Sequence, residues 1–412
     1  MSNVIIIGGG AAGMMAAITA ARNNNKVTLI EKNEKLGKKL FITGKGRCNF
    51  TNAGDEEDIF NSIVTNKKFM YSSLRGFSNY DCMGFFDELG LKFKIERGNR
   101  VFPESDHSSD VIGALSRQMK KLGVNVLLNT QVVAVNEENG EFAGVVVKDA
   151  SGQKEIKGDA CVIATGGNSY SSTGSTGDGY RFAKSLGHSI TPILPALVPL
   201  NVREEWEELL MGLSLKNIEV TFYDGDKKVF TDFGEMLFTH FGISGPVVLS
   251  MSAYLKNIGK EKYKIEIDLK PALTDEQLNA RVLRDFKKYS KKHLVNSLDD
   301  LLPKALIPIV ISLSGIEPHK AVNEITREER NGLVHVLKHF TLTAVGVRPV
   351  EEAIVTAGGV KVSEINPSTM ESKLVSGLYF AGEVIDIDGY TGGYNLQAAF
   401  STGYLAGMNA AE

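Results

Sequence analysis

Cysteine is scarce in this chain, and the few cysteines follow no binding pattern. The 412 residues include three, Cys48, Cys82 and Cys161, and none belongs to a C-x-x-C pair. This spacing excludes a disulfide framework, a zinc knuckle and the usual kind of dithiol redox centre. The sequence also has no H-x-x-H, H-E-x-x-H or G-x-S-x-G string, so we predict no metal site and no α/β-hydrolase.

The sequence has neither a strong net charge nor a long apolar run. Its 46 Lys and Arg residues against 49 Asp and Glu residues give a net charge of -3, so the overall charge favours neither DNA nor an acidic membrane surface. The longest apolar stretch, residues 306–313, is interrupted by Pro308 and is too short to span a bilayer. Because no basic signal region precedes the first apolar run, we expect a cytoplasmic protein with no membrane association.

Length and glycine content are the positive features of the composition. A chain of 412 residues exceeds what one hydrophobic core of ~250–300 residues holds, so several domains are expected. Hydrophobic residues at 43% and charged residues at 23% are ordinary for globular proteins. Glycine accounts for 42 of the 412 residues and has no collagen-like period, which calls for a local explanation.

The first glycine cluster follows an apolar β-branched run, Val4–Ile7. It reads G-x-G-x-x-G, with Gly8, Gly10 and Gly13, and leads into the Ala-rich, helix-forming residues 14–22. In a strand–turn–helix unit the first glycine makes the tight turn and the second lets a pyrophosphate approach the backbone. The third lets helix and strand pack closely. The context therefore predicts a dinucleotide on the helix N-terminus.

An acidic residue, Glu31, occupies the position at which such a strand–turn–helix unit binds ribose. A second strand-like run, residues 26–30, ends at Glu31, which lies 21 residues after Gly10. An acidic side chain at this position accepts hydrogen bonds from ribose hydroxyls and disfavours a 2′-phosphate. FAD or NAD is therefore expected here rather than NADP.

A second glycine-rich segment, residues 43–52, is dense in hydrogen-bond donors. Such a segment suits a long ligand with a polar ribityl chain and a diphosphate, although an ordinary polar loop would have a similar composition. Cys48 beside Arg47 could be a reactive thiol. An isolated cysteine is more often a small packed residue, which is the reading we favour.

A third glycine-rich junction lies near the C-terminus. Residues 377–383 form a strand-like run that ends in Gly382 and Glu383, and further glycines precede a helix expected over 396–408. One ligand that spans both ends of the chain would explain two such junctions. Glu383 would then accept from a ribityl hydroxyl, and the helix N-terminus would face the flavin pyrimidine edge.

These motifs together resemble the HI0933-like family of bacterial FAD-dependent flavoproteins, within the glutathione-reductase-like group of two-dinucleotide-binding-domain proteins. The resemblance covers nearly the whole chain and rests on Gly8 to Gly13, Gly37 to Lys39, Thr43 to Asn52, Val101 to Pro103, Ala164 to Gly167, Leu237 to His240, Gly242 to Pro246 and Gly382 to Gly403.

The resemblance implies an α/β fold: a Rossmann-like FAD-binding domain with a β-meander, plus an inserted small β-barrel-like domain and a helical subdomain. The expected boundaries are 1–190 and 358–412 for the FAD-binding domain, 191–272 and 341–357 for the β domain, and 273–340 for the helical insert.

Local patterns predict several elements inside these domains. Three β runs with intervening turns are expected between 124 and 160, which would form the meander. Short alternating runs, including 246–252, are expected as strands of the β domain. Helices are expected at 78–89, 110–122, 274–288, 298–303, 306–313 and 327–339.

The residues expected to contact the cofactor come from all three glycine-rich regions and from the strands near them. They are Gly8, Gly10, Ala11, Ala12, Gly13, Glu31, Lys32, Lys39, Thr43, Gly44, Gly46, Arg47, Cys48, Asn49, Val133, Ala164, Thr165, Gly166, Gly382, Glu383, Gly393, Asn395, Leu396 and Gln397.

Three side chains are candidates for proton transfer to a substrate. His240 lies in a family string, in the domain that the resemblance places over the flavin, but a histidine that holds a β turn would fit equally well. Tyr390 and Tyr394 flank the C-terminal glycine turn and could donate a proton or simply pack there.

The predicted function is an FAD-dependent oxidoreductase that transfers electrons or hydride to or from a small organic substrate, with NADH or NADPH as a transient reductant. No second G-x-G-x-x-G with an acidic partner occurs, so a nicotinamide would bind transiently beside the flavin. The alternative is an FAD-binding protein with a structural, sensing or RNA- or partner-binding role, acting through the basic stretch 281–293. RNA is disfavoured because such a run is usually a solvated helix face. The oligomeric state is left open.

Overall fold

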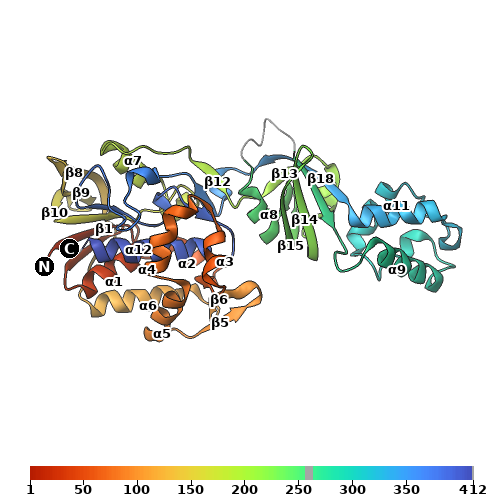
Figure 1. Cartoon of the computed structure of the whole chain (residues 1–412), viewed down its shortest axis with the longest axis horizontal. Helices are drawn as coiled ribbons and strands as arrows, with labels where there is room; N and C mark the ends of the chain where they lie inside the picture. Colours follow the sequence, from red (N-terminus) through yellow and green to blue (C-terminus); the bar gives the residue numbers. More distant parts are fainter. Residues whose placement is uncertain (256–262, 411–412) are drawn as a thin grey trace. The chain divides into compact units, whose positions relative to one another are not determined.

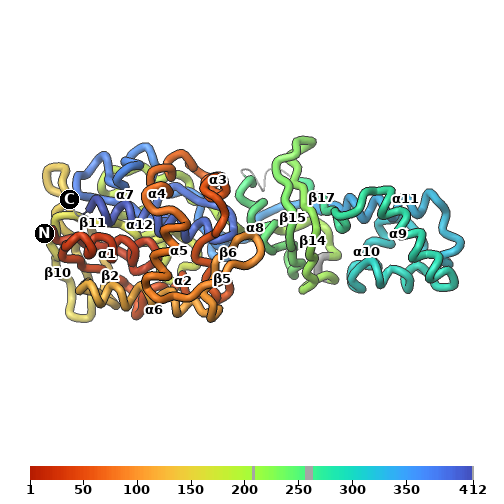
Figure 2. Tube along the Cα trace, turned by 60° about the horizontal axis from the view of Figure 1, so that its bottom comes forward, coloured from red at the N-terminus to blue at the C-terminus, as the bar shows by residue number. Residues whose placement is uncertain are grey.

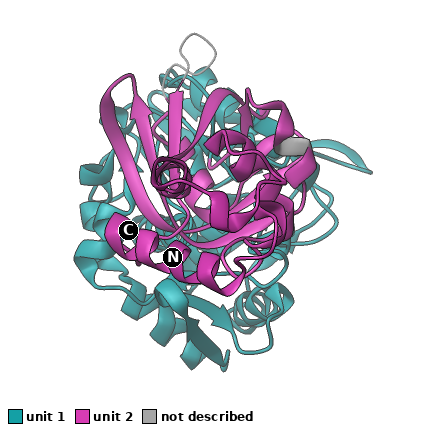
Figure 3. Ribbon diagram, turned by 90° about the vertical axis from the view of Figure 1, so that its right-hand side faces the viewer, with its two compact units in different colours: residues 1–196, 350–412 teal, residues 197–349 magenta. Residues whose placement is uncertain are grey.

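The computed structural model describes residues 1–255 and 263–410, apart from the side chains at 207 and 208. The chain forms two compact units (Figure 3). The first contains Met1–Ala196 and the C-terminal part from Val350, and the second contains Leu197–Pro349. The chain passes from one unit to the other between residues 196 and 197 and returns between 349 and 350. The sequence analysis placed the ends of the FAD-binding domain at 190 and 358. The barrel and the helical insert belong to one unit.

A five-stranded parallel sheet forms the centre of the first unit, in the order β20-β11-β1-β2-β7. Its strands are β1 (Asn3–Ile7), β2 (Lys26–Ile30), β7 (Asn125–Leu127), β11 (Ala160–Ile163) and β20 (Leu378–Phe380). The apolar run before Gly8 is the central strand, paired with both β11 and β2. The expected meander run at 124–128 is instead the edge strand β7, because its parallel partner β2 is contributed by a distant part of the chain.

Helices from opposite ends of the chain lie side by side over this sheet (Figures 1 and 2). These are α1 (Ala11–Arg22) and α12 (Tyr394–Asn409). Their close approach depends on glycine: a Cβ added at Gly403 would lie 2.4 Å from the Ala12 carbonyl oxygen, and one at Gly407 would lie 2.5 Å from that of Ala16. The two glycine-rich ends of the sequence are thereby held together.

The remaining helices and small sheets surround this centre. The expected meander is present as β10-β9-β8. The bounds of the other elements of the first unit are α2 (Lys38–Ile42), β3 (Thr51–Asn52), α3 (Glu56–Asn61), β4 (Ile63–Thr65), α4 (Tyr71–Gly76), α5 (Asn79–Glu88), β5 (Phe93–Glu96), β6 (Arg100–Pro103), α6 (Ser108–Lys121), β8 (Gln131–Glu138), β9 (Glu141–Asp149), β10 (Gly152–Lys157), α7 (Asp178–Ser185), β12 (Leu194–Ala196), β19 (Val355–Ala357) and β21 (Asp388–Gly389).

The second unit contains a closed six-stranded antiparallel barrel, as the resemblance implied. Its order is β13-β16-β15-β14-β17-β18, and β18 closes it by pairing with both β17 and β13. The strands are β13 (Leu200–Val202), β14 (Ser214–Asp224), β15 (Lys227–Thr239), β16 (Gly242–Ser244), β17 (Tyr263–Asp268) and β18 (Phe340–Val347). Apolar side chains of the barrel and of the adjoining helices form one core.

The prediction of a strand at 246–252 is wrong, because Pro246–Ser252 forms the helix α8. Pro246 occupies the first turn of this helix, where a missing N–H costs nothing. Gly245, at φ +101°, makes the sharp entry into the helix.

Three α-helices lie between β17 and β18. They are α9 (Asp275–Lys288), α10 (Ile307–Ser314) and α11 (Arg327–Lys338). Thr274 and Thr326 form capping boxes with Gln277 and Glu329, which fixes the starts of α9 and α11. The helix expected at 298–303 is wrong: the segment forms turns, because six residues ending in a proline are too few to sustain a helix. No helix among the described residues is long and apolar enough to cross a membrane.

Candidate cofactor site

The three glycines of the first motif have different surroundings. A Cβ on Gly8, which has φ +106°, would lie 2.5 Å from the Ala164 carbonyl oxygen, and one on Gly13 would lie 1.9 Å from that of Gly8. A Cβ on Gly10 would meet no atom within 4 Å. Gly8 and Gly13 are therefore required by the protein's own packing. Gly10 borders open space, as the approach of a diphosphate requires.

The N-terminus of α1 opens onto the same place. Gly10 is its N-cap residue, and no side chain caps the helix. The first intrahelical bond runs from the Met14 N–H to the Gly10 carbonyl at 2.9 Å, so the N–H groups of Ala11, Ala12 and Gly13 precede it. Unpaired N–H groups at the positive end of a helix dipole attract phosphate. The residues present therefore fit the diphosphate of FAD.

Glu31 ties the end of β2 to the glycine turn. Its carboxylate is buried and accepts from the Gly9 N–H at 2.8 Å, from the Asn33 N–H at 2.8 Å and from Asn33 Nδ2 at 2.7 Å. These bonds fix the turn in shape. Oε1 already accepts two of these bonds and Oε2 accepts one, so Oε2 still has capacity for a ribose hydroxyl, and that role for Glu31 remains a prediction.

An ion pair at 2.7 Å joins Lys39 to Glu383. The Glu383 carboxylate also accepts from the Thr356 N–H at 2.8 Å and from Ser169 Oγ at 3.2 Å. Burial alone would raise the pKa of Glu383, but the Lys39 charge and these hydrogen bonds more than offset it, and its pKa lies below the usual range. The group is an anion held at the carboxyl ends of β11 and β20.

Gly166 and Gly167 leave room for this anion. A Cβ at Gly167 would lie 2.5 Å from Thr356 Oγ1 and 3.0 Å from the Glu383 carboxyl carbon, while Gly166 adopts φ +74°. The sequence indicated Glu383, Lys39 and Gly166, but not Ser169 or Thr356. No local signal marks these two hydroxyl residues, because they come from segments far apart in the sequence.

The segment around Cys48 is held by ion pairs and by burial. Arg47 forms ion pairs with Glu96 and Asp106, and its guanidinium lies 4.2 Å from the centre of the Phe102 ring. Cys48 is fully buried with φ +58°, and burial raises the pKa of its thiol far above the usual value. A thiol in this position is inert, in agreement with the reading that it is a packed residue.

The C-terminal junction is held by amide side chains. The Asn395 side chain accepts from the Gly389 N–H at 2.8 Å and donates to the Gly389 carbonyl at 2.7 Å. Gln397 is fully buried and bonds to Thr51 Oγ1 and the Phe77 carbonyl. Asn395 thus fixes the loop that precedes α12, and Gln397 connects α12 to the N-terminal part of the unit. Their contact with a cofactor remains a prediction.

Other predicted contact residues lie close to these groups within the first unit. Thr43 Oγ1 donates to the Lys39 carbonyl, Asn49 Oδ1 accepts from the Val101 N–H, Lys32 pairs with Asp178, and the Val133 carbonyl accepts from Arg181. Gly44 and Gly46 adopt φ +62° and +84°, Gly382 adopts +75°, and Gly393, at +101°, begins α12, with Leu396 partly buried in its first turn.

The candidate proton donors do not all belong to one unit. Tyr390 and Tyr394 lie at the C-terminal junction of the first unit, and a Cβ at Gly392 would come within 2.6 Å of the Tyr394 ring. His240 belongs to the second unit, where it is exposed in the turn between β15 and β16 with its ring against Phe241.

Asp388 is a buried carboxyl group that the sequence analysis did not single out. It is 3% exposed, and within the described part of the chain its Oδ1 atom has no hydrogen-bond partner. Burial raises the pKa of Asp388 to about 6, assisted by the charges of Asp386 and Glu383 and opposed by a hydrogen bond with Thr65. Its place in a glycine-rich string was the only sequence signal.

Comparisons with known proteins match this arrangement over nearly the whole chain. A family model described as the HI0933-like protein Rossmann domain matches residues 2–409. A 3-dehydro-bile acid delta(4,6)-reductase of Clostridium scindens is 34% identical over 390 residues, which cover 94% of this chain and 93% of that protein. A ribosomal RNA dihydrouridine synthase of Haemophilus influenzae is 34% identical over 385 residues, covering 93% and 92%.

A solved structure has a similar fold at low identity. The 3-ketosteroid-delta4-(5alpha)-dehydrogenase of Rhodococcus jostii gives a TM-score of 0.53 at 14% identity, over 100% of this chain and 97% of that one. At this identity the similarity concerns the fold alone.

Proposed function

Since the chain belongs to the HI0933-like family of FAD-dependent oxidoreductases, we propose that it reduces a carbon–carbon double bond conjugated to a carbonyl group, with NADH or NADPH as the electron source. The observation that carries this proposal is the chemistry common to the two named relatives. A 3-dehydro steroid with double bonds at positions 4 and 6 is a conjugated ketone. A uridine that becomes dihydrouridine loses a double bond conjugated to its ring carbonyl.

The residues of the first unit would hold FAD at the two glycine-rich junctions. The α1 N-terminus with the open space at Gly10 would bind the diphosphate, and Glu31 would bind the ribose. When bound, FAD supplies a two-electron carrier: NAD(P)H and one proton are consumed, and the double bond gains two hydrogens. The Lys39–Glu383 pair lies at the strand ends, where it would fix the polar chain of the cofactor.

One proton must be delivered to the substrate for each double bond reduced. Tyr390 and Tyr394 lie in the same unit as the proposed cofactor site, while His240 belongs to the other unit. Replacement of the true donor should lower kcat for substrate reduction while the flavin still accepts electrons at the normal rate. The test measures both rates, substrate reduction and flavin reduction, in the variants Tyr390→Phe, Tyr394→Phe and His240→Gln.

Anaerobic stopped-flow spectroscopy tests the function. Flavin absorbance should bleach on mixing with NADH or NADPH and return on mixing with a conjugated ketone such as 4-androstene-3,17-dione or with a uridine-containing RNA. The finding that neither nucleotide bleaches the flavin would sink the proposal and favour the alternative, an FAD-binding protein with a structural or sensing role. If bleaching occurs but neither class of acceptor restores the absorbance, the proposed double-bond chemistry is wrong.

A further inference from the structure

The two relatives' names leave two substrate classes, a small organic ketone and an RNA base. The second class is the one that a relative's name already gives, and we propose where this chain would hold such a substrate: the helical part of the second unit carries an RNA-binding face. This inference rests on the proposed function and adds the surface that would bind an RNA substrate. It is carried by a cluster of cations between Arg281 and His293.

The cluster is strongly basic in a chain that is weakly acidic overall. Residues 281–293 contain six Lys and Arg residues and one acidic residue, Asp285, while the whole chain has a net charge of -3. Two of the six cations are neutralised: Arg281 pairs with Asp285 at 2.9 Å and Lys288 with Asp300 at 2.6 Å. The remaining four are exposed and form no ion pair within the described residues; they are Arg284, Lys287, Lys291 and Lys292.

Local structure brings these cations together. Arg284 and Lys287 are three residues apart on α9 and share one face of the helix. The chain turns directly after α9, where the Lys292 N–H donates to the Tyr289 carbonyl at 2.8 Å. Lys288 Nζ and Lys292 Nζ lie 4.7 and 4.5 Å from the centre of the Tyr289 ring. The tyrosine therefore holds the cations of the helix next to those that follow it.

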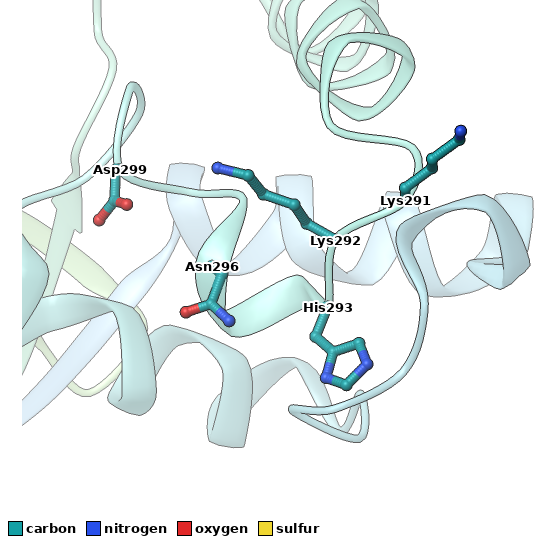
Figure 4. Close-up of a pocket in the computed structure, with 5 residues that line it drawn as sticks. All are labelled: Lys291, Lys292, His293, Asn296 and Asp299. Carbon is teal, nitrogen blue, oxygen red and sulfur yellow. The ribbon is translucent and has the colours of Figure 1, made fainter.

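An open hollow of about 510 Å³ lies beside this turn (Figure 4). It is lined by Lys291, Lys292, His293, Asn296 and Asp299, so that donors outnumber the single carboxylate. Such a lining suits a phosphate backbone, which is bound by Lys, Arg and Asn donors. The exposed imidazoles of His293 and His319, 5.7 Å apart edge to face, could stack on an unpaired base.

The proposed reaction balances with the components already named. Uracil carries a double bond between C5 and C6 that is conjugated to the C4 carbonyl. One hydride, supplied by NAD(P)H through the flavin, and one proton saturate this bond, so the base is reduced and the nicotinamide is oxidised. The basic face takes no part in this chemistry. It would hold the nucleic acid, and each phosphate contact would contribute about 0.7 to the slope of log affinity against log salt for single-stranded RNA.

The test compares two triple variants of the FAD-loaded protein. Lys287→Glu/Lys291→Glu/Lys292→Glu reverses three exposed cations of the proposed face. Lys120→Glu/Lys121→Glu/Lys184→Glu reverses three exposed lysines of the first unit and changes the net charge equally. The probe is protein-free bacterial ribosomal RNA transcribed in vitro. Binding is measured by filter retention across a salt series, and dihydrouracil formation by nucleoside mass spectrometry.

We expect the first variant to lose at least about tenfold in RNA affinity and about two units of salt slope, since it loses three phosphate contacts. Its dihydrouracil formation should fall in parallel, while NAD(P)H still bleaches the flavin at the wild-type rate. The control variant should behave as wild type. Equal affinity of the two triple variants, or no RNA binding by the wild type, would overturn the inference. A wild type that binds RNA but is not reduced by NAD(P)H would instead sink the proposed function.

Discussion

At the scale of single residues, the candidate site depends on charged groups whose partners come from distant segments. Glu383 is 18% exposed and Lys39 is 25% exposed, and the pair is completed by Ser169 and the Thr356 N–H. Glu383 was predicted from its position after a strand-like run and Lys39 from a string that resembles the family, and the contact of each with a cofactor remains a prediction. The sequence could not show that they bind each other, because 344 residues separate them.

Loss of the Lys39 charge should destabilise the protein. Lys39→Met leaves the Glu383 carboxylate without its counter-ion, at an expected cost of about 2 kcal/mol after allowance for partial exposure. Lys38→Met is the matched control, since the Glu34 partner of Lys38 is 58% exposed and the pair should be worth less than about 0.5 kcal/mol. Urea unfolding measures both. Equal free energies of unfolding for the two variants would contradict the structural role of the pair.

Asp388 should make stability depend on pH. Its folded-state pKa of about 6 exceeds the ordinary value of 3.8, so it favours folding below about pH 4, and this contribution is lost as the pH rises through 6. The change amounts to up to about 3 kcal/mol between these limits. Asp388→Asn should flatten this part of the pH profile of unfolding free energy. Asp149→Asn should leave it unchanged, because hydrogen bonds from Ser151 and Lys154 hold the pKa of Asp149 below its usual value. A profile of Asp388→Asn parallel to that of wild type would disprove the assignment.

At the scale of elements, close helix packing brings the two ends of the chain together. The glycines of α12 meet the backbone of α1, which lets both helix N-termini reach one region of the first unit. The strand–turn–helix unit at Gly8 was predictable because its glycines occur at a fixed spacing. Helix α8 was missed because a short apolar run has no decisive period, and strand β7 was assigned to the wrong sheet because its partner strand is distant in sequence.

Alanine at Gly403 should therefore be destabilising although alanine favours helices. The added Cβ would lie 2.4 Å from the Ala12 carbonyl oxygen, and the overpacking should cost about 2 kcal/mol. Gly332→Ala in α11 is the control, because the atom nearest to an added Cβ there would be the Ser314 carbonyl oxygen at 3.8 Å. At that position the higher helix propensity of alanine should raise the free energy of unfolding by up to about 1 kcal/mol. Thermal unfolding of both variants gives the comparison, and a Gly403→Ala variant as stable as wild type would argue against the observed helix contact.

At the scale of the whole molecule, each unit has its own hydrophobic core. Composition and length predicted several domains, and the motif resemblance indicated an inserted barrel. The places where the chain passes between the units depend on pairings such as β12 with β19, which local patterns do not reveal, and the expected domain boundaries remain predictions. The barrel is likewise closed by β18, which follows β17 only after the helices.

Because each unit has its own core and the proposed cofactor contacts all lie in the first unit, we expect FAD to stabilise the first unit and not the second. A hundredfold excess of FAD over its dissociation constant should add about 2.7 kcal/mol to that unit. Trp206, the single tryptophan, packs against Phe340 in the second unit and reports on its unfolding. Calorimetry with parallel tryptophan fluorescence should show one transition that moves with FAD and one that does not. A single transition that shifts as a whole would refute the separation.

The flavin content of Gly10→Val tests the central claim, that FAD binds at the N-terminal glycine junction. Gly10 and Gly84 both have open space around an added Cβ, so valine should fit the protein at either position. After identical purification, wild type and Gly84→Val should carry flavin at about one equivalent, and Gly10→Val should be folded and colourless, because its side chain fills the space expected to receive the diphosphate. A folded Gly10→Val protein with the full flavin content would contradict the account.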